Sequence, residues 1–492
     1  MTVTPIGFIV IGISLAIFVL KPGYLVLWAI LVSPFQAASV FNVEGGFPIG
    51  IAPFFFVSLL IAFQFMTLWL SGKLSFSRGD IALRISRPLL LLTMWSVASA
   101  FILPKLFAGV GVDTPRGGMD SPYTVPLQWT MSNAAQATYM VLNSMFIVLM
   151  IWQSSRRFFE LAVWAFIGSG VLATLVASWQ LIAHYGQLPY PADFFNSNVA
   201  WKQLFSQHVA GVWRLSGSFT EPSVAGSFFA IWCTFLLFMA TQSRSAPIWA
   251  WPMLLCGTTM LVLTASTTGY LLAGLVMALF VLRELRRMLL RGKLNITALA
   301  CLIVAFCALA AIALYNHDAA RLFNKLILEK QESASARDRL TTILQAITIS
   351  FDTYGLGAGL GSNRPSGMLF YVLSNIGVPG LLLFSWFLYA TGSAAIEVLP
   401  TKDGSHECTF LSAACWAFAV ETLAMAGAGG DMSGPFLWIC WALVATGTRS
   451  MWVQSQEPSR SRERPDGEIV VGANVRSEQP FQPSYPAELY SH

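Results

Sequence analysis

Charge is scarce in this chain. Asp, Glu, Lys and Arg together make up 11% of its 492 residues, whereas soluble domains average about 25%. A chain this long with so few charges cannot cover a water-facing surface, and 55% of it is hydrophobic. The composition therefore excludes a soluble globular protein and indicates that lipid is the main solvent. The formal net charge of +5 is small, and we expect no nucleic-acid partner.

Signatures of several enzyme classes are missing as well. The chain has no GxxxxGK[ST] phosphate-binding loop and no HExxH zinc motif. It also has no Asp-x-Asp pair, the common metal-binding pair of nucleotide-sugar transferases. The seven cysteines include no CxxC and fall in or beside predicted spans, so disulfides and zinc are not expected. We expect no metal and no cofactor.

Carboxylates are almost absent from the predicted spans. Ion-coupled transporters usually carry several of them within the membrane. Here Glu421, followed by Asp431 at a helix end, is nearly all there is. This argues against a transporter, which remains an alternative.

Long apolar runs fill most of the chain. A transmembrane helix needs about 20 apolar residues, and helices are the economical structure for such runs in lipid. The candidate spans lie near residues 6–20, 24–42, 51–70, 88–108, 134–153, 160–183, 222–242, 249–265, 268–283, 294–314, 367–390, 408–427 and 434–448. We therefore expect an all-α polytopic membrane protein with about 12–14 transmembrane helices and a large helical periplasmic loop.

Basic residues predict the orientation of these spans. They cluster in four regions that the span pattern places on one side, namely residues 73–87, 156–157, 283–293 and 449–464. Lys and Arg mark the cytoplasmic side, so three longer loops near 109–133, 184–221 and 315–366 are expected in the periplasm. We expect residues 1–454 to form the transmembrane domain. The Ser-, Pro-, Glu- and Arg-rich tail, 455–492, is predicted to be disordered and cytoplasmic.

The first candidate site is the segment WRLSGSFTEPSVAG, which joins the second periplasmic loop to a span. Arg214 stands just before the membrane, and Glu221 stands where a helix would begin at Pro222. Such a sequence also suits a simple capped helix start. The functional hypothesis is a carboxylate and a guanidinium held together at the mouth of a cavity.

A second candidate is a short hydroxyl-rich turn between two spans that contains Ser266 and Thr267. In the simpler interpretation, these hydroxyls satisfy free backbone groups of a tight turn. In the functional one, they bind substrate.

The third candidate is the large loop, where Arg337 and Arg339 precede an apolar stripe at helical spacing. The stripe consists of Leu340, Ile343, Leu344 and Ile347. The helical angle places Arg337 nearer to it, so Arg337 is expected to face the protein interior. A glycine run with Gly357 and Gly359 follows, and then Arg364. This run could bring backbone close to a ligand, or form a plain loop.

Together these segments resemble the O-antigen ligase and Wzy-type polysaccharide polymerase superfamily. The matching motifs, in order, are Arg214 with Gly217–Pro222, the turn Ser266–Gly269, Arg337 with its amphipathic helix, Gly355–Gly359, and Leu373–Gly380. The Glu-Pro-Ser form looks like the exopolysaccharide or capsule polymerase branch. The ligases carry a histidine after the glycine run, where this chain has Asn363–Ser366.

The resemblance implies a metal-independent glycosyltransferase in the bacterial inner membrane, with its active site facing the periplasm. It would polymerise oligosaccharide repeat units linked to undecaprenyl pyrophosphate into exopolysaccharide, O-antigen or capsule. A chain-length regulator and a flippase of the same pathway are possible partners, besides the lipid bilayer.

The resemblance also suggests residue roles. The expected catalytic residues are Arg214, Glu221 and Arg337. The expected substrate-binding residues are Arg339, Arg364, Ser266, Thr267, Gly357 and Gly359. The arginines would bind the pyrophosphate leaving group in place of a metal. An O-antigen ligase that transfers glycan to a lipid A core remains an alternative, as does a transporter of polysaccharide or lipid-linked sugar.

Overall fold

The computed structural model describes residues 1–460, with gaps at 44, 46–47, 114–123, 201–202, 204–206, 210–211, 243–246, 293–333, 400–404 and 429–430. The chain divides into two units, Met1–Trp452 and Val453–His492. The tail predicted to be disordered lies outside the described residues from 461 onward, and residues 453–460 are helical.

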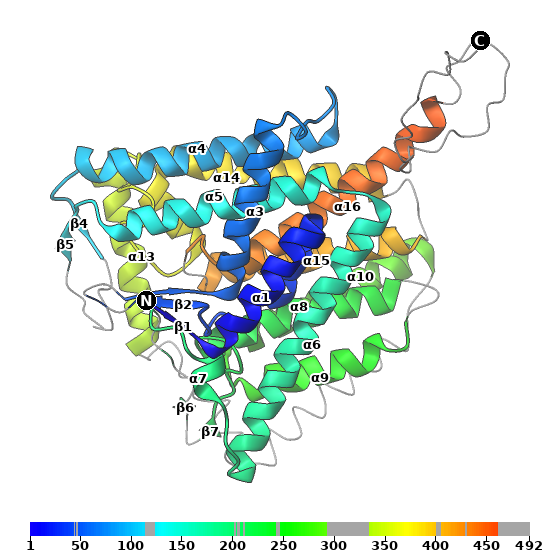
Figure 1. Ribbon diagram of the computed structural model, residues 1–492, viewed down its shortest axis with the longest axis horizontal. Helices are drawn as coiled ribbons and strands as arrows, with labels where there is room; N and C mark the ends of the chain where they lie inside the picture. The colour runs from blue at the N-terminus through cyan, green and yellow to red at the C-terminus, as the bar shows by residue number, and fades with distance from the viewer. Residues whose placement is uncertain are drawn as a thin grey trace, which may run out of the picture. The chain divides into compact units, whose positions relative to one another are not determined.

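Helices make up most of the described chain (Figure 1). They are α1 (Pro5–Leu20), η1 (Pro22–Tyr24), α2 (Leu25–Val32), α3 (Pro53–Leu70), α4 (Ile81–Leu106), α5 (Met131–Trp152), α6 (Arg156–Gly186), α7 (Ala192–Phe195), α8 (Pro222–Gln242), α9 (Ala250–Leu263), α10 (Thr267–Arg291), α13 (Ala334–Asp352), α14 (Met368–Val398), α15 (His406–Ala428) and α16 (Pro435–Arg460).

Among the described residues, eight helices are long and apolar enough to cross a membrane: α3, α4, α5, α6, α8, α10, α14 and α15. Three shorter apolar stretches, Pro5–Leu20, Pro22–Val32 and Ala250–Leu263, accompany them. This confirms the predicted all-α polytopic membrane protein. The predicted span at 294–314 lies outside the described residues.

The predicted span at 24–42 is wrong in its second half. The helix ends at Val32, where Pro34 cannot donate the next helical hydrogen bond. The chain then forms the strand β2 (Phe41–Val43), which pairs with β1 (Thr2–Val3) and β3 (Ile49–Ile51) in an antiparallel sheet. The apolar composition of this segment suits a strand as well as a helix.

Two further antiparallel hairpins are short. One pairs β4 (Gly111–Val112) with β5 (Val125–Pro126), and the other pairs β6 (His208–Val209) with β7 (Val212–Trp213). In Figure 1 the strands and α13 lie at one end of the first unit, which we call the loop end. All three loops that were predicted to be periplasmic contribute to it.

The core of the first unit is built around the first half of α16. Its residues from Phe436 to Ala445 are all buried, as expected of a helix that is apolar on every side. The Trp441 indole N–H donates to the Thr391 hydroxyl of α14. Near the far end of this stretch, Arg449 pairs with Asp80 at 2.7 Å and donates to the Ile151 carbonyl at 2.8 Å. α16 thus ties together helices that are distant in sequence.

Candidate functional site

Arg214 is held in place by groups from two segments. Its Nη1 donates to Gln207 Oε1 at 2.9 Å, and its Nε donates to the Thr264 carbonyl at 3.1 Å. Its backbone N–H donates to the Gln207 carbonyl at 3.0 Å. The side chain is half-buried, so the guanidinium has a defined orientation between the β7 segment and the turn after α9.

Glu221 lies immediately before α8, and its charge acts on Arg214. The Ser223 hydroxyl donates to Glu221 Oε1. Burial lowers the pKa of Arg214, and the Glu221 carboxylate opposes that shift. The two charges therefore act on one another, and their position at the mouth of a cavity stays a prediction. α8 begins at Pro222, as predicted.

The hydroxyl-rich turn packs against the same place. Ser266 is buried and caps α10, accepting a hydrogen bond from the Gly269 N–H at 3.2 Å. A Cβ on Gly226 of α8 would lie 2.9 Å from the Ser266 Cβ, so the two helices touch here. Thr267 is half-buried in the first turn of α10. The structure thus brings together four predicted site residues, namely Arg214, Glu221, Ser266 and Thr267, and we call them the Arg214 group.

The glycine run forms a second, tightly packed part of the loop end. Gly357 and Gly359 have φ of +86° and +99°, values that L-residues with side chains rarely adopt. A Cβ on Gly357 would lie 2.6 Å from the Asn375 backbone, and one on Gly359 would lie 2.6 Å from Pro104. These glycines are therefore required by the fold, whatever else they contact.

The run fits into a break in α14. At Gly377 the helix has a φ of 69° and a ψ of −169°, and Pro379 has no N–H to give the Asn375 carbonyl. The Gly359 N–H donates to that carbonyl instead, at 2.7 Å. The Val378 N–H turns to the Gly355 carbonyl at 2.8 Å. A broken helix is tolerated at membrane depth only where its freed groups are paired within the protein, as these are.

A carboxamide network then fixes the chain before Arg364. Asn375 Oδ1 accepts from the N–H groups of Ser362 and Asn363 at 2.9 and 3.0 Å, and its Nδ2 donates to the Asn363 carbonyl at 2.8 Å. The Arg364 N–H donates to the Asp113 carbonyl at 3.3 Å. Burial raises the pKa of the Asp113 carboxyl. The network orients the Arg364 backbone although the arginine follows a loop.

Arg364 belongs to a polar cluster that sequence reasoning missed. Gln136 of α5 donates from Nε2 to Asp431 Oδ2 at 2.9 Å, and the Tyr371 hydroxyl makes a long 3.4 Å contact to Gln136 Oε1. The charges of Arg364 and Asp431 both act on the Tyr371 hydroxyl. The same two charges act on Tyr139. We call these five residues the Arg364 cluster. Its only signal in the sequence was a lone Asp431 at a helix end.

The two arginines in the first turns of α13 are oriented differently from the prediction. Arg337 is exposed and Arg339 is half-buried, so the expectation that Arg337 faces the interior is wrong. The apolar stripe is only partly turned outward, because Leu340 and Leu344 are exposed, Ile343 and Ile347 are half-buried, and Ile349 is buried. The exposed leucines suit contact with lipid.

Contacts join α13 and the Arg214 group to the Arg364 cluster. The Ser366 N–H donates to Thr342 Oγ1 of α13 at 3.2 Å. Between the two groups, the Phe219 ring lies 6.1 Å from that of Phe436, which follows Asp431 by five residues. An apolar contact two residues before Glu221 therefore links the segments that carry the two groups.

The described residues contain no cluster of three or more His, Cys, Asp or Glu side chains that could hold a metal. A pocket lined by residues from the start of α4, from α14 and from α16 contains none of the predicted site residues.

Comparison with known families gives one match. The family model described as WcaD colanic acid polymerase matches residues 80–366. This range contains all the predicted site residues but stops short of Tyr371 and Asp431. No curated protein matches the chain.

Proposed function

The chain belongs to the WcaD colanic acid polymerase family, and from this premise we propose that it joins oligosaccharide repeat units into exopolysaccharide, capsule or O-antigen. The family match covers more than half of the chain and is the observation that carries the proposal. It agrees with the polymerase branch that the sequence motifs resembled. The protein is an enzyme of the glycosyltransferase type and crosses the membrane several times.

The proposed donor is a repeat-unit glycan on undecaprenyl pyrophosphate. A hydroxyl of the acceptor glycan attacks the anomeric carbon of the donor, and the bond from that carbon to the phosphate oxygen breaks. Undecaprenyl pyrophosphate leaves with the electron pair. Negative charge on the departing phosphate therefore has to be stabilised.

Arginines are suited to this task, because a guanidinium presents a planar, permanently charged fork to phosphate oxygens. The hydrogen bonds from Arg214 to Gln207 and Thr264 fix that side chain before substrate arrives. The Arg364 N–H donates to the Asp113 carbonyl, and the charges of Arg364 and Asp431 both act on the Tyr371 hydroxyl. We assign both arginines to the pyrophosphate, with Arg339 and the exposed Arg337 at the entrance. No metal is required in this scheme.

The acceptor hydroxyl loses a proton during the transfer. We propose that this proton is accepted by Glu221, the carboxylate whose charge acts on Arg214. Asp431 accepts hydrogen bonds from Gln136 and from the Ser433 N–H, so we assign it to positioning. The hydroxyl and amide groups of Tyr139, Tyr371 and Gln136 would then bind sugar hydroxyls.

We place the loop end in the periplasm, with the basic regions at the cytoplasmic side of the inner membrane. A flippase would deliver the lipid-linked units to this face, and a chain-length regulator would limit the length of the polymer. The lipid tail of the donor would lie against the spans.

Reconstitution tests the proposal. Purified full-length protein in lipid vesicles is supplied with lipid-linked repeat units, and products are resolved by gel electrophoresis. We expect a ladder of polymer that persists in EDTA and disappears in Arg214→Ala. Loss of activity in EDTA with rescue by one divalent ion would contradict the metal-independent scheme. Absence of a polymer ladder under every condition would contradict the polymerase function.

A further inference from the structure

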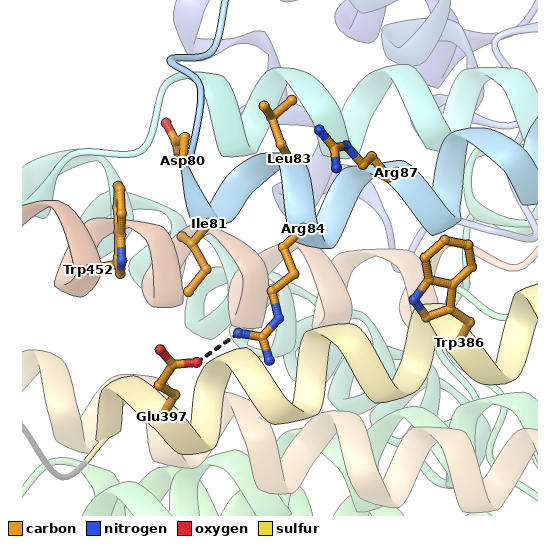
Figure 2. Close-up of a pocket in the computed structure, with 9 residues that line it drawn as sticks. Asp80, Ile81, Leu83, Arg84, Arg87, Trp386, Glu397 and Trp452 are labelled. Carbon is orange, nitrogen blue, oxygen red and sulfur yellow. Dashed lines mark hydrogen bonds and ion pairs between the residues drawn. The ribbon is translucent and has the colours of Figure 1, made fainter.

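A pocket of about 410 Å³ lies between α4, α14 and α16, away from the residues assigned to catalysis (Figure 2). Its lining includes Arg84 and Arg87 of α4, Trp386 and Glu397 of α14, and Trp452 of α16. We call it the α4–α14 pocket. It lies where α4 begins and α14 ends, and both helices are long and apolar enough to cross a membrane.

The wall of this pocket carries one uncompensated positive charge. Asp80 is buried and its charge is neutralised by Arg449 at 2.7 Å. Arg84 pairs with Glu397 at 2.7 Å, but both side chains are exposed, and exposed ion pairs are weak. Arg87 is exposed and has no hydrogen-bond or ion-pair partner within the described part of the chain. In Figure 2 the Arg84 guanidinium extends toward Glu397 of α14, whereas Arg87, one helical turn along, extends to the other side of α4, so an anion would meet the exposed Arg87 first.

The pocket also extends from the charged boundary into the apolar zone. Glu397 and Trp386 are separated along α14 by about 16 Å, at 1.5 Å per residue. Trp386 is 47% exposed, and the outward-facing Leu382 and Tyr389 flank it at 66% and 72% exposure. Basic side chains beside these exposed apolar side chains match an amphipathic molecule with an anionic head.

We propose that the α4–α14 pocket binds an anionic phospholipid of the surrounding membrane, with its headgroup phosphate on Arg87 and Arg84. Basic pockets between transmembrane helices are suited to such headgroups, and the arginine fork matches phosphate oxygens. The acyl chain lies along Trp386 and Leu382. The bound lipid bridges α4 and α14.

This bridge has a consequence for the loop end. The same two helices hold the glycine run, since Gly359 packs against Pro104 of α4 and the Trp95 indole donates to the Ile376 carbonyl of α14 at 2.8 Å. A ligand that binds only the folded protein stabilises it. The lipid therefore stabilises the helix pair on which the glycine run depends.

The test uses full-length protein in phosphatidylcholine nanodiscs with an increasing fraction of phosphatidylglycerol. The thermal unfolding midpoint at each fraction gives an apparent lipid affinity. Arg87→Ala is expected to weaken this affinity about tenfold, the effect of losing one charge-assisted hydrogen bond. Glu397→Gln is expected to strengthen it, because Arg84 then loses its competing carboxylate. A gain of affinity cannot arise from misfolding.

Arg157→Ala is the matched control, since Arg157 is exposed in the first turn of α6. It should leave the affinity unchanged. An equal loss in Arg157→Ala and Arg87→Ala would indicate general surface attraction and overturn the proposal. So would unchanged affinity in both Arg87→Ala and Glu397→Gln. Equal stabilisation by glycerol 1-phosphate in pure phosphatidylcholine would show that a free phosphate, and not a lipid, occupies the pocket.

Discussion

Gln136 donates a hydrogen bond to Asp431 at 2.9 Å, although 295 residues separate them in the chain. Gln136 lies near the start of α5 and Asp431 just before α16. The Tyr371 hydroxyl of α14 contacts the same carboxamide. Three helix starts therefore meet in one polar cluster at the loop end, beside Arg364.

The cluster predicts that the Asp431 charge matters for activity. Asp431→Asn replaces the acceptor oxygen with an amide that faces the Gln136 N–H groups, and we expect polymer formation to fall about tenfold or more. Ser433→Ala keeps the carboxylate and is the control, with a smaller loss. The rate of ladder formation in reconstituted vesicles measures both. Wild-type activity in Asp431→Asn would show that the Arg364 cluster is not part of the active site.

Arg214 should not tolerate lysine. An ammonium cannot contact both Gln207 and Thr264 while offering a fork to phosphate, so Arg214→Lys should lose about tenfold or more in rate. Arg157→Lys, at an exposed arginine in α6, should keep full activity. Expression and the unfolding midpoint should match the wild type in both variants. An active Arg214→Lys would mean that only the charge is needed there.

Replacing Gly357 tests the fit of the glycine run into α14. An alanine there must adopt a positive φ and overlap the Asn375 backbone, so we expect a loss of about 2–4 kcal/mol in stability. Gly274→Ala is the control, because Gly274 is exposed within α10 with open space around it. That variant should gain up to about 1 kcal/mol from helix propensity. Equal thermal midpoints in detergent would contradict the packing described.

The two arginines of α13 give a comparison within one helix turn. Arg339 is the more buried, and its neighbour Thr342 contacts Ser366, two residues after Arg364. We expect Arg339→Ala to lower the rate of polymer formation more than Arg337→Ala. The reverse order would indicate that α13 rotates when substrate binds, or that Arg337 reaches the donor from the surface.

Most helices were predictable from the sequence because apolar length alone defines a span. α8, for example, begins at the predicted Pro222. The break in α14 was not predictable in this way, since Gly377 and Pro379 stand in an otherwise apolar run whose pairing depends on Gly355 and Gly359. The distant glycines supply the missing hydrogen-bond partners.

The candidate site was predictable only where its residues are close in sequence. Arg214 and Glu221 both lie within eight residues before the start of α8, so one sequence motif contains them both. Asp431 and Gln136 meet only through the tertiary fold. The predicted orientation of α13 was wrong for another reason. In a soluble protein the apolar stripe marks the core, but here Leu340 and Leu344 are exposed while Ala346 and Ile349 are buried.

The lipid-linked intermediates of a deletion strain test the central claim most directly. Cells that lack this protein are extracted, and the glycans released from undecaprenyl pyrophosphate are sized by gel electrophoresis. The account predicts single repeat units that an external glycosidase can reach, with long polymer absent and restored by the wild-type gene. Long polymer still attached to undecaprenyl pyrophosphate would indicate a ligase, units trapped on the cytoplasmic face would indicate a transporter, and either result would contradict the polymerase.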